Sequence, residues 1–166
     1  MSKDQEATFA ELYRTYQDMV FQLCLGFMKG DEDAARDVSQ EVFVNCWQVM
    51  DKFRQQASYK TWVYRITVNT CLQHLRRHRK QVRVPLSDQL PVAAPPPASA
   101  NPYQPLYHAI GQLGKVDRLV IMLVLDELPY EEIAQITGLA AGTLRVRIHR
   151  IKKQLKQLLT HERTQQ

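Results

Sequence analysis

The residue types between positions 53 and 80 could bind a single strand of nucleic acid. The segment reads FRQQASYKTWVYRITVNTCLQHLRRHRK and mixes Tyr59, Trp62 and Tyr64 with arginine and lysine. Aromatic faces on which unpaired bases stack, set within a positive groove, hold a single strand without reading a duplex. Trp62 and Tyr64 also fit a helical core, and Asn69 fits either a buried amide or a contact to a base. The segment therefore predicts a strand-binding surface, but the sequence does not decide which of these residues belong to it and which belong to the core.

A second basic segment, residues 141–156, has the pattern of an amphipathic helix. Its apolar residues recur at spacings of four, three and four, namely Leu144, Ile148, Ile151 and Leu155. On a helical wheel the opposite face presents Thr143, Val146, His149, Arg150 and Lys153, with Arg145 beside it. Arginine makes bidentate contacts to guanine, threonine and valine touch thymine methyl groups, and lysine neutralises phosphate, so this face suits the major groove. Arg147 flanks the apolar stripe, and we expect it to pair with Glu131, with Glu132 or with phosphate.

The chain lacks the residue patterns of an enzyme or a metal site. Its five serines include no GxSxG, and its six glycines form no phosphate-binding loop. His74 and His78 are four residues apart, but no third ligand accompanies them. The sequence predicts no catalytic group, no metal and no cofactor. The three cysteines form no CxxC pair, which favours reduced, buried thiols.

The basic residues lie in two blocks, which are separated from most of the acidic residues. Residues 53–83 carry eight basic residues and no acidic one, and residues 140–166 carry seven basic residues and one acidic. Residues 1–52 instead carry five basic and ten acidic residues. Two separate cationic surfaces predict two contacts with a polyanion, and the acidic surface is left for another partner.

The elements that must position these residues are helices. Apolar residues recur with helical spacing over residues 9–27, 33–50 and 59–76, which predicts a three- to four-helix N-terminal bundle. Seven of the eight prolines lie within residues 85–105, where neither a helix nor a central strand is sustained. Beyond them, Pro129 begins a short helix and Gly138 ends it, and a further helix is predicted over residues 141–159. A helix, a glycine-containing turn and a second helix are the pattern of a helix-turn-helix motif.

The sequence therefore predicts an all-α fold of two small helical domains. We assign residues 1–83 to the first domain, 84–105 to a flexible Pro-rich linker, 106–160 to a C-terminal helix-turn-helix domain and 161–166 to a tail. An extended linker of this length reaches at most about 70 Å, which matches two turns of duplex DNA. The N-terminus lacks the apolar stretch of an export signal, so we expect a cytoplasmic protein with no segment inserted in the membrane.

Three motifs together resemble those of a known family. They read DEDAARDVSQEVFVNCW, FRQQASYKTWVYRI and LPYEEIAQITGLAAGTLRVRIHR, in this order. On them the chain resembles an extracytoplasmic-function (group IV) sigma factor of the bacterial sigma-70 family. The resemblance implies a non-enzymatic subunit that binds core RNA polymerase and directs promoter-specific initiation, under the control of an anti-sigma factor. Its first domain would recognise and melt the minus-ten element, and its second would read the minus-thirty-five element.

The resemblance also implies roles for individual residues. Polymerase docking would fall to Asp37, Gln40 and Glu41. The minus-ten element, including the melted non-template strand, would contact Arg54, Ser58, Tyr59, Lys60 and Asn69, with phosphate held by Arg76, Arg77 and Arg79. The minus-thirty-five duplex would contact Arg145, Val146, His149 and Arg150, of which the wheel places the last three on its outer face and Arg145 at the flank. Gln55 stands where relatives often have glycine, and Ala140 stands where they have a capping residue.

Two other functions remain open at this point. A free-standing helix-turn-helix regulator would use its first domain for dimerisation or for an effector, and it would leave a palindromic footprint on duplex DNA. A nucleic-acid enzyme would turn over single strands in a metal-dependent reaction. Formation of a complex with core polymerase discriminates both from the sigma factor.

Overall fold

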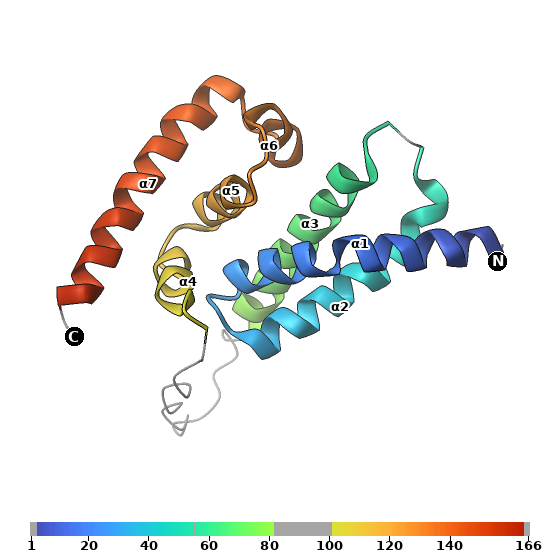
Figure 1. Ribbon diagram of the computed structural model, residues 1–166, viewed down its shortest axis with the longest axis horizontal. Coiled ribbons are helices and arrows are strands. Elements are labelled where there is room, and N and C mark those ends of the chain that lie inside the picture. The colour runs from blue at the N-terminus through green and yellow to red at the C-terminus, as the bar shows by residue number, and fades with distance from the viewer. Residues whose placement is uncertain (1–2, 55, 82–100, 165–166) are drawn as a thin grey trace.

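The protein is built of helices in two groups that touch (Figure 1). The computed structural model describes residues 3–54, 56–81 and 101–164. Within these ranges every regular element is a helix and no strand occurs. The predicted all-α class, with an N-terminal bundle and a C-terminal helix-turn-helix group, is confirmed. No helix in the described ranges is both long and apolar enough to cross a membrane.

The first group is a three-helix bundle. It consists of α1 (Lys3–Phe27), α2 (Glu32–Val49), the short 3-10 helix η1 (Met50–Lys52) and α3 (Tyr59–Gln81). Each long helix turns an apolar stripe toward the other two, so that Val20, Val38 and Val63 are fully buried. Asp31 starts α2, because its carboxylate accepts a hydrogen bond of 3.0 Å from the backbone N–H of Ala34. The predicted helices over residues 9–27, 33–50 and 59–76 correspond to these three elements.

The second group contains four helices. They are α4 (Gln104–Gly111), α5 (Lys115–Leu125), α6 (Tyr130–Thr137) and α7 (Ala141–Thr164). Gly138 ends α6 in the left-handed conformation at φ 74°, which a residue without Cβ adopts most easily, and α7 starts three residues later. Ile133, Leu144 and Ile151 are fully buried where α6 and α7 meet the rest of the group. The predicted helix-turn-helix is therefore made by α6 and α7.

The chain between the two groups is described only from Asn101 onward. Helix α4 begins at Gln104, so Gln104 and Pro105, the last two residues assigned to the linker, are helical. Pro105 fits there because the first turn of a helix does not need its missing N–H. Residues 101–103 form the turn that leads into α4, and residues 84–100 of the predicted linker lie outside the described residues.

The three cysteines lie in the core of the bundle, as free thiols with no exposed surface. Cys24 of α1 and Cys71 of α3 bring their Sγ atoms to 3.8 Å. The hydrogen bond with Cys71, together with burial, raises the pKa of the Cys24 thiol far above its usual range. Burial raises the pKa of Cys46 to about 12. The thiols of Cys24 and Cys46 are therefore protonated and unreactive at neutral pH, and the burial of all three cysteines agrees with the prediction of reduced, buried thiols.

Candidate nucleic-acid interface

The outer face of α7 is a continuous solvent-exposed surface. Leu144, Ile148 and Leu155 are buried, so the opposite side of the helix faces away from the core. Val146, at 72% exposure, shows how far this side projects. All six residues predicted to contact the minus-thirty-five duplex are exposed: Thr143, Arg145, Val146, His149, Arg150 and Lys153. The structure thus brings them together on one face of the second helix of a helix-turn-helix, where major-groove contacts are made.

Arg147 does not belong to this face. Its Nε donates to Oδ1 of Asp117 in α5 at 2.5 Å, and both side chains are largely shielded from solvent. The expectation that Arg147 pairs with Glu131 or Glu132 is wrong, because the inner flank of α7 at this point faces α5 rather than the start of α6. The ion pair ties α7 to α5 and so fixes the orientation of the helix that carries the exposed face.

We expect the Asp117–Arg147 pair to stabilise the second helical group by about 1 kcal/mol, as partly buried pairs do. Asp117→Asn and Arg147→Gln should each lower the free energy of unfolding, and the double variant should lose less than the sum of the two. Urea denaturation of the four chains measures this coupling. Arg145→Gln, an exposed neighbour, is the control for removing a positive charge from α7. Strict additivity of the two losses would show that the pair contributes nothing.

The strand-binding segment predicted over residues 53–80 contains an aromatic cluster at its N-terminal end. The rings of Phe53 and Tyr59 stack with centroids 4.6 Å apart, and Trp62 lies 5.1 Å from Phe53. Tyr64, in contrast, is fully buried and belongs to the core. The ring of Phe53 was not singled out from the sequence, since nothing in its spacing distinguishes it from a core residue. The partly exposed cluster of Phe53, Tyr59 and Trp62 offers stacking faces at the start of α3.

The polar residues around this cluster are accessible. Arg54, Ser58 and Lys60 are exposed, whereas Gln55 lies outside the described residues. The Ser58 hydroxyl also has a structural role, because its Oγ accepts a hydrogen bond of 3.1 Å from the backbone N–H of Thr61. Ser58 therefore caps the first turn of α3. A contact from Ser58 to DNA would have to share that hydroxyl.

Further along α3, the side chains predicted to contact the minus-ten element are also exposed. Asn69 is solvent-exposed, which removes the alternative of a buried core amide. Arg76, Arg77 and Arg79 are exposed near the C-terminal end of the helix. Arg77 donates from Nη2 to Oε1 of Glu41 at 2.5 Å, and this pair joins α3 to α2.

The predicted polymerase-docking residues lie on the solvent side of α2. Asp37 and Gln40 are exposed, and Glu41 is half-buried through its pairing with Arg77. Val44 lies one turn beyond Gln40 and is 53% exposed, so an apolar side chain lies in solvent beside these polar residues. We name Asp37, Gln40, Glu41 and Val44 the α2 face. The signal for Val44 was present in the sequence, because it is four residues after Gln40 and off the buried stripe.

The two helical groups match two family models in the expected order. Residues 12–81 match Sigma-70 region 2, and residues 103–155 match Sigma-70, region 4. The first range covers nearly the whole three-helix bundle, and the second covers α4 to α6 and most of α7.

Full-length relatives and solved structures agree with these matches. The ECF RNA polymerase sigma-E factor of Escherichia coli is 31% identical over 92% of this chain and 87% of its own length. The ECF RNA polymerase sigma factor SigW of Bacillus subtilis is 28% identical over 93% and 92%. The sigma factor RpoE of Bartonella quintana, solved in complex with the anti-sigma factor NepR, superposes with a TM-score of 0.76 at 22% identity, over 92% of this chain and 97% of that one. CnrH, solved in complex with the cytosolic domain of CnrY, superposes with a TM-score of 0.69 over 94% and 90%.

An exposed basic helix-turn-helix face, an aromatic and basic surface at the start of α3, and relatives that match along nearly the whole chain agree with one another. The chain belongs to the ECF sigma factors of the sigma-70 family.

Proposed function

We propose that this protein binds core RNA polymerase and directs it to a two-part promoter, with no catalytic step of its own. The observation that carries the proposal is the continuous exposed face of α7, on which Thr143, Arg145, Val146 and Arg150 combine base-reading and phosphate-binding residue types. The acidic α2 face is exposed and available to the polymerase. The α2 face lies in the first helical group and the α7 face in the second, so one chain can bind both the polymerase and the DNA.

Within this function the minus-ten element is assigned to the bundle. Its melted non-template strand would stack on Tyr59 and its aromatic neighbours, while Arg54, Lys60 and Asn69 hold or read it and Ser58 shapes the loop. Arg76, Arg77 and Arg79 would bind phosphates at the other end of α3. Since Arg77 is paired with Glu41 in the free chain, its contact with phosphate competes with that ion pair.

The direct test is transcription with purified components. Core polymerase supplemented with this chain should form a complex in gel filtration and give run-off transcripts from a subset of genomic fragments. A chain that never co-elutes with core polymerase would contradict the proposal. Tight duplex binding by the chain alone, with a palindromic footprint, would instead identify a free-standing regulator.

We also propose that an anti-sigma factor controls the protein and that it acts in the cytoplasm, where core polymerase and DNA are found. The support is family membership together with the solved structure of the sigma factor RpoE of Bartonella quintana, which holds the anti-sigma factor NepR. Co-purification of the tagged chain under non-inducing conditions should recover such a partner.

Arg150→Ala should weaken promoter binding at one base position of the minus-thirty-five element. An arginine that reads a base edge contributes about 1–3 kcal/mol of discrimination there, which is roughly a 5- to 150-fold change in relative affinity. Binding of the holoenzyme to a library with each base of the element varied measures the effect. Lys153→Ala is the control, since loss of a phosphate contact weakens all sequences alike and lowers the salt dependence. A uniform loss for Arg150→Ala would assign it to the DNA backbone.

A further inference from the structure

Val146 is an apolar side chain in the middle of a polar, cationic surface. It is 72% exposed, which is the largest exposed fraction among the large apolar side chains that the structure describes. The residues one turn before and one turn after it are also exposed, namely Gly142, Thr143, His149 and Arg150. A β-branched residue is a poorer helix former than alanine, arginine or lysine. Valine at this position therefore contributes nothing to the stability of the free chain.

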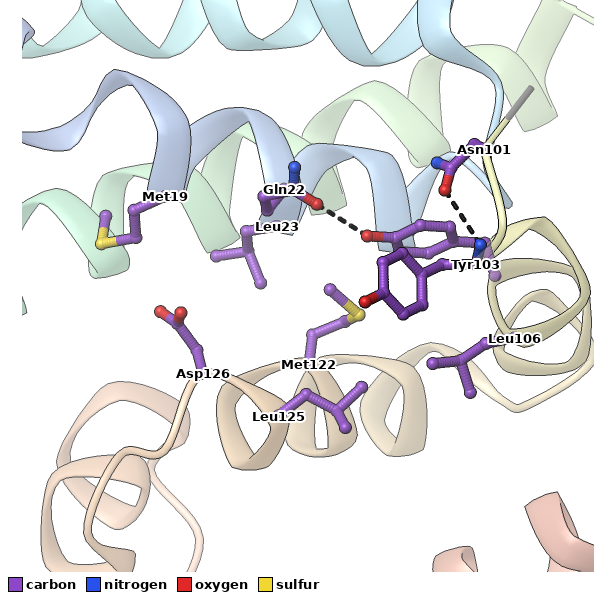
Figure 2. A pocket seen from close by; sticks show the side chains of 10 residues that line it. Met19, Gln22, Leu23, Asn101, Tyr103, Leu106, Met122, Leu125 and Asp126 are labelled. Atoms are coloured by element: carbon purple, nitrogen blue, oxygen red, sulfur yellow. Dashed lines mark hydrogen bonds between the residues drawn. The ribbon is translucent and has the colours of Figure 1, made fainter. Parts of the chain in front are cut away.

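Other strongly exposed apolar side chains lie beside further apolar groups. Tyr103 and Leu125 line a cleft of about 400 Å³ together with Leu106 and Met122 (Figure 2). Packing against these neighbours accounts for apolar residues at both positions. Val146 has no apolar side chain one turn away on either side, so packing within the chain does not account for it.

The direction in which Val146 points is fixed by its neighbours in the sequence. Leu144 and Ile148, two residues before and two residues after it, are buried in the core of the second helical group. Arg147, the next residue, is held by its ion pair with Asp117 of α5. Val146 is therefore held outward within the first two turns of α7, which is the part of a recognition helix that contacts base edges.

The major groove offers one apolar group to such a side chain. The edges of guanine, adenine and unmodified cytosine present hydrogen-bond donors and acceptors, whereas thymine adds a methyl group at C5. A valine placed against a donor or an acceptor would leave it without a partner, at a cost in free energy. Contact with a 5-methyl group instead removes apolar surface of both partners from water.

Arg150 places a second base contact close to Val146. It lies four residues further along α7, so that the two Cβ atoms are about 6 Å apart on the same face. Within the described ranges Arg150 has no ion pair or hydrogen bond to the protein, unlike Arg147, so its guanidinium is free for bidentate contact with guanine. Since successive base pairs are about 3.4 Å apart, the two side chains reach bases within about two base pairs of each other.

We propose that Val146 selects promoters by contacting the 5-methyl group of a pyrimidine, close to the guanine that Arg150 contacts. The inference rests on the proposed function, because it concerns the face that would read the minus-thirty-five element. It names the chemical group that is read, which is a methyl group in the major groove. Thymine carries this group, and so does 5-methylcytosine. Promoter binding by this chain therefore responds to methylation of a cytosine at that position.

The test changes one methyl group of the DNA at a time. In a promoter fragment that gives a run-off transcript, each thymine of the minus-thirty-five element is replaced in turn, on either strand, by deoxyuridine. Deoxyuridine pairs as thymine does but lacks the methyl group, and fluorescence anisotropy of the labelled fragment measures binding of the holoenzyme. Val146→Ser removes the apolar side chain, and serine and valine have similar helix propensities. The matched control is Val116→Ser, because Val116 is another exposed valine, in the first turn of α5 and outside the α7 face.

One deoxyuridine should lower the affinity of the wild-type holoenzyme about fourfold, the factor that corresponds to burial of one methyl group. Val116→Ser should keep this ratio of thymine to deoxyuridine affinity, whereas for Val146→Ser the ratio should fall to about one. At the same position, the wild type should bind 5-methylcytosine about fourfold better than cytosine, and Val146→Ser should bind both alike. The position should lie within about two base pairs of the guanine that Arg150→Ala identifies.

The inference is overturned if no deoxyuridine changes the affinity of the wild type, or if the effect persists in Val146→Ser, which would assign the methyl contact to another side chain such as Thr143. Complex formation with core polymerase is measured on the same samples. If the chain binds duplex DNA only by itself, the proposed function fails, and the same base replacements in the duplex that it selects from a random library still test Val146. A chain that binds duplex DNA in neither form contradicts both.

Discussion

Asp37→Arg is expected to lower the affinity of the chain for core polymerase by about a hundredfold while leaving the free chain folded. Asp37 is exposed on the α2 face, and the residues behind it, Val38 and Val42, are fully buried and untouched by the change. Placing a like charge where an interface expects a complementary one costs several kcal/mol, and about 2.7 kcal/mol corresponds to a hundredfold. Titration of labelled chain with core polymerase measures the loss.

The control for Asp37→Arg is Glu11→Arg. Glu11 is an exposed acidic residue of α1 that lies outside the α2 face, so the net charge changes equally in both variants. If the acidic N-terminal half acts only through its total charge, both variants lose affinity alike, and a discrete docking surface on α2 is contradicted. A further variant, Val44→Ser, should show a smaller loss if the exposed valine is also covered by the polymerase.

The helices of this fold can be read from the sequence because their signals are local. An apolar stripe with a period near 3.6 residues places α1, α2 and α7, and Gly138 marks the turn before the recognition helix. The exposed face of α7 follows from the same periodicity, since fixing Leu144 and Ile148 in the core fixes the opposite side in solvent. Local pattern therefore predicts both the element and the face.

Contacts between distant residues could not be predicted in this way. Arg118 is one of 22 basic residues, and nothing nearby indicates that it is buried against the end of a helix 91 positions away. The partner of Arg147 was placed wrongly for the same reason: Asp117, Glu131 and Glu132 are equally plausible by charge, and only the packing of α5 against α7 decides among them. The sequence did not decide whether Tyr64 and Asn69 are buried or exposed, because the edge between the apolar and polar faces of an amphipathic helix is uncertain by about half a turn.

The pairing of Glu41 with Arg77 links two surfaces that the sequence treats as separate. One partner lies on the α2 face and the other among the predicted phosphate contacts of α3. The pair is exposed enough that its net contribution to stability is small. The pair would instead couple the two surfaces in both directions. Polymerase bound at Glu41 would release Arg77 toward the DNA, and phosphate bound at Arg77 would release Glu41 toward the polymerase.

Arg118→Met should have the largest effect on stability of the substitutions considered, lowering the free energy of unfolding by about 3 kcal/mol. Besides its bond to Phe27, the Arg118 guanidinium donates from Nη2 to the carbonyl oxygens of Gly111 at 2.8 Å and Leu113 at 3.2 Å. It places a positive charge at the C-terminal ends of α1 and α4, where the helix dipoles favour one. Burial lowers the pKa of Arg118, but arginine remains charged, so methionine removes a cation and leaves three buried acceptors unpaired.

Thermal and urea unfolding measure the loss, and hydrogen exchange locates it, with amides of α4 and α5 losing protection first. The stability of Arg118→Lys should lie between those of the wild type and Arg118→Met, since an ammonium keeps the charge but lacks the planar geometry needed to reach all three acceptors. Arg145→Met, an exposed arginine replaced by the same residue, should stay within about 0.5 kcal/mol of the wild type. If Arg118→Met were equally mild, the three carbonyl groups would be satisfied by water, and Arg118 would not hold the ends of these helices together.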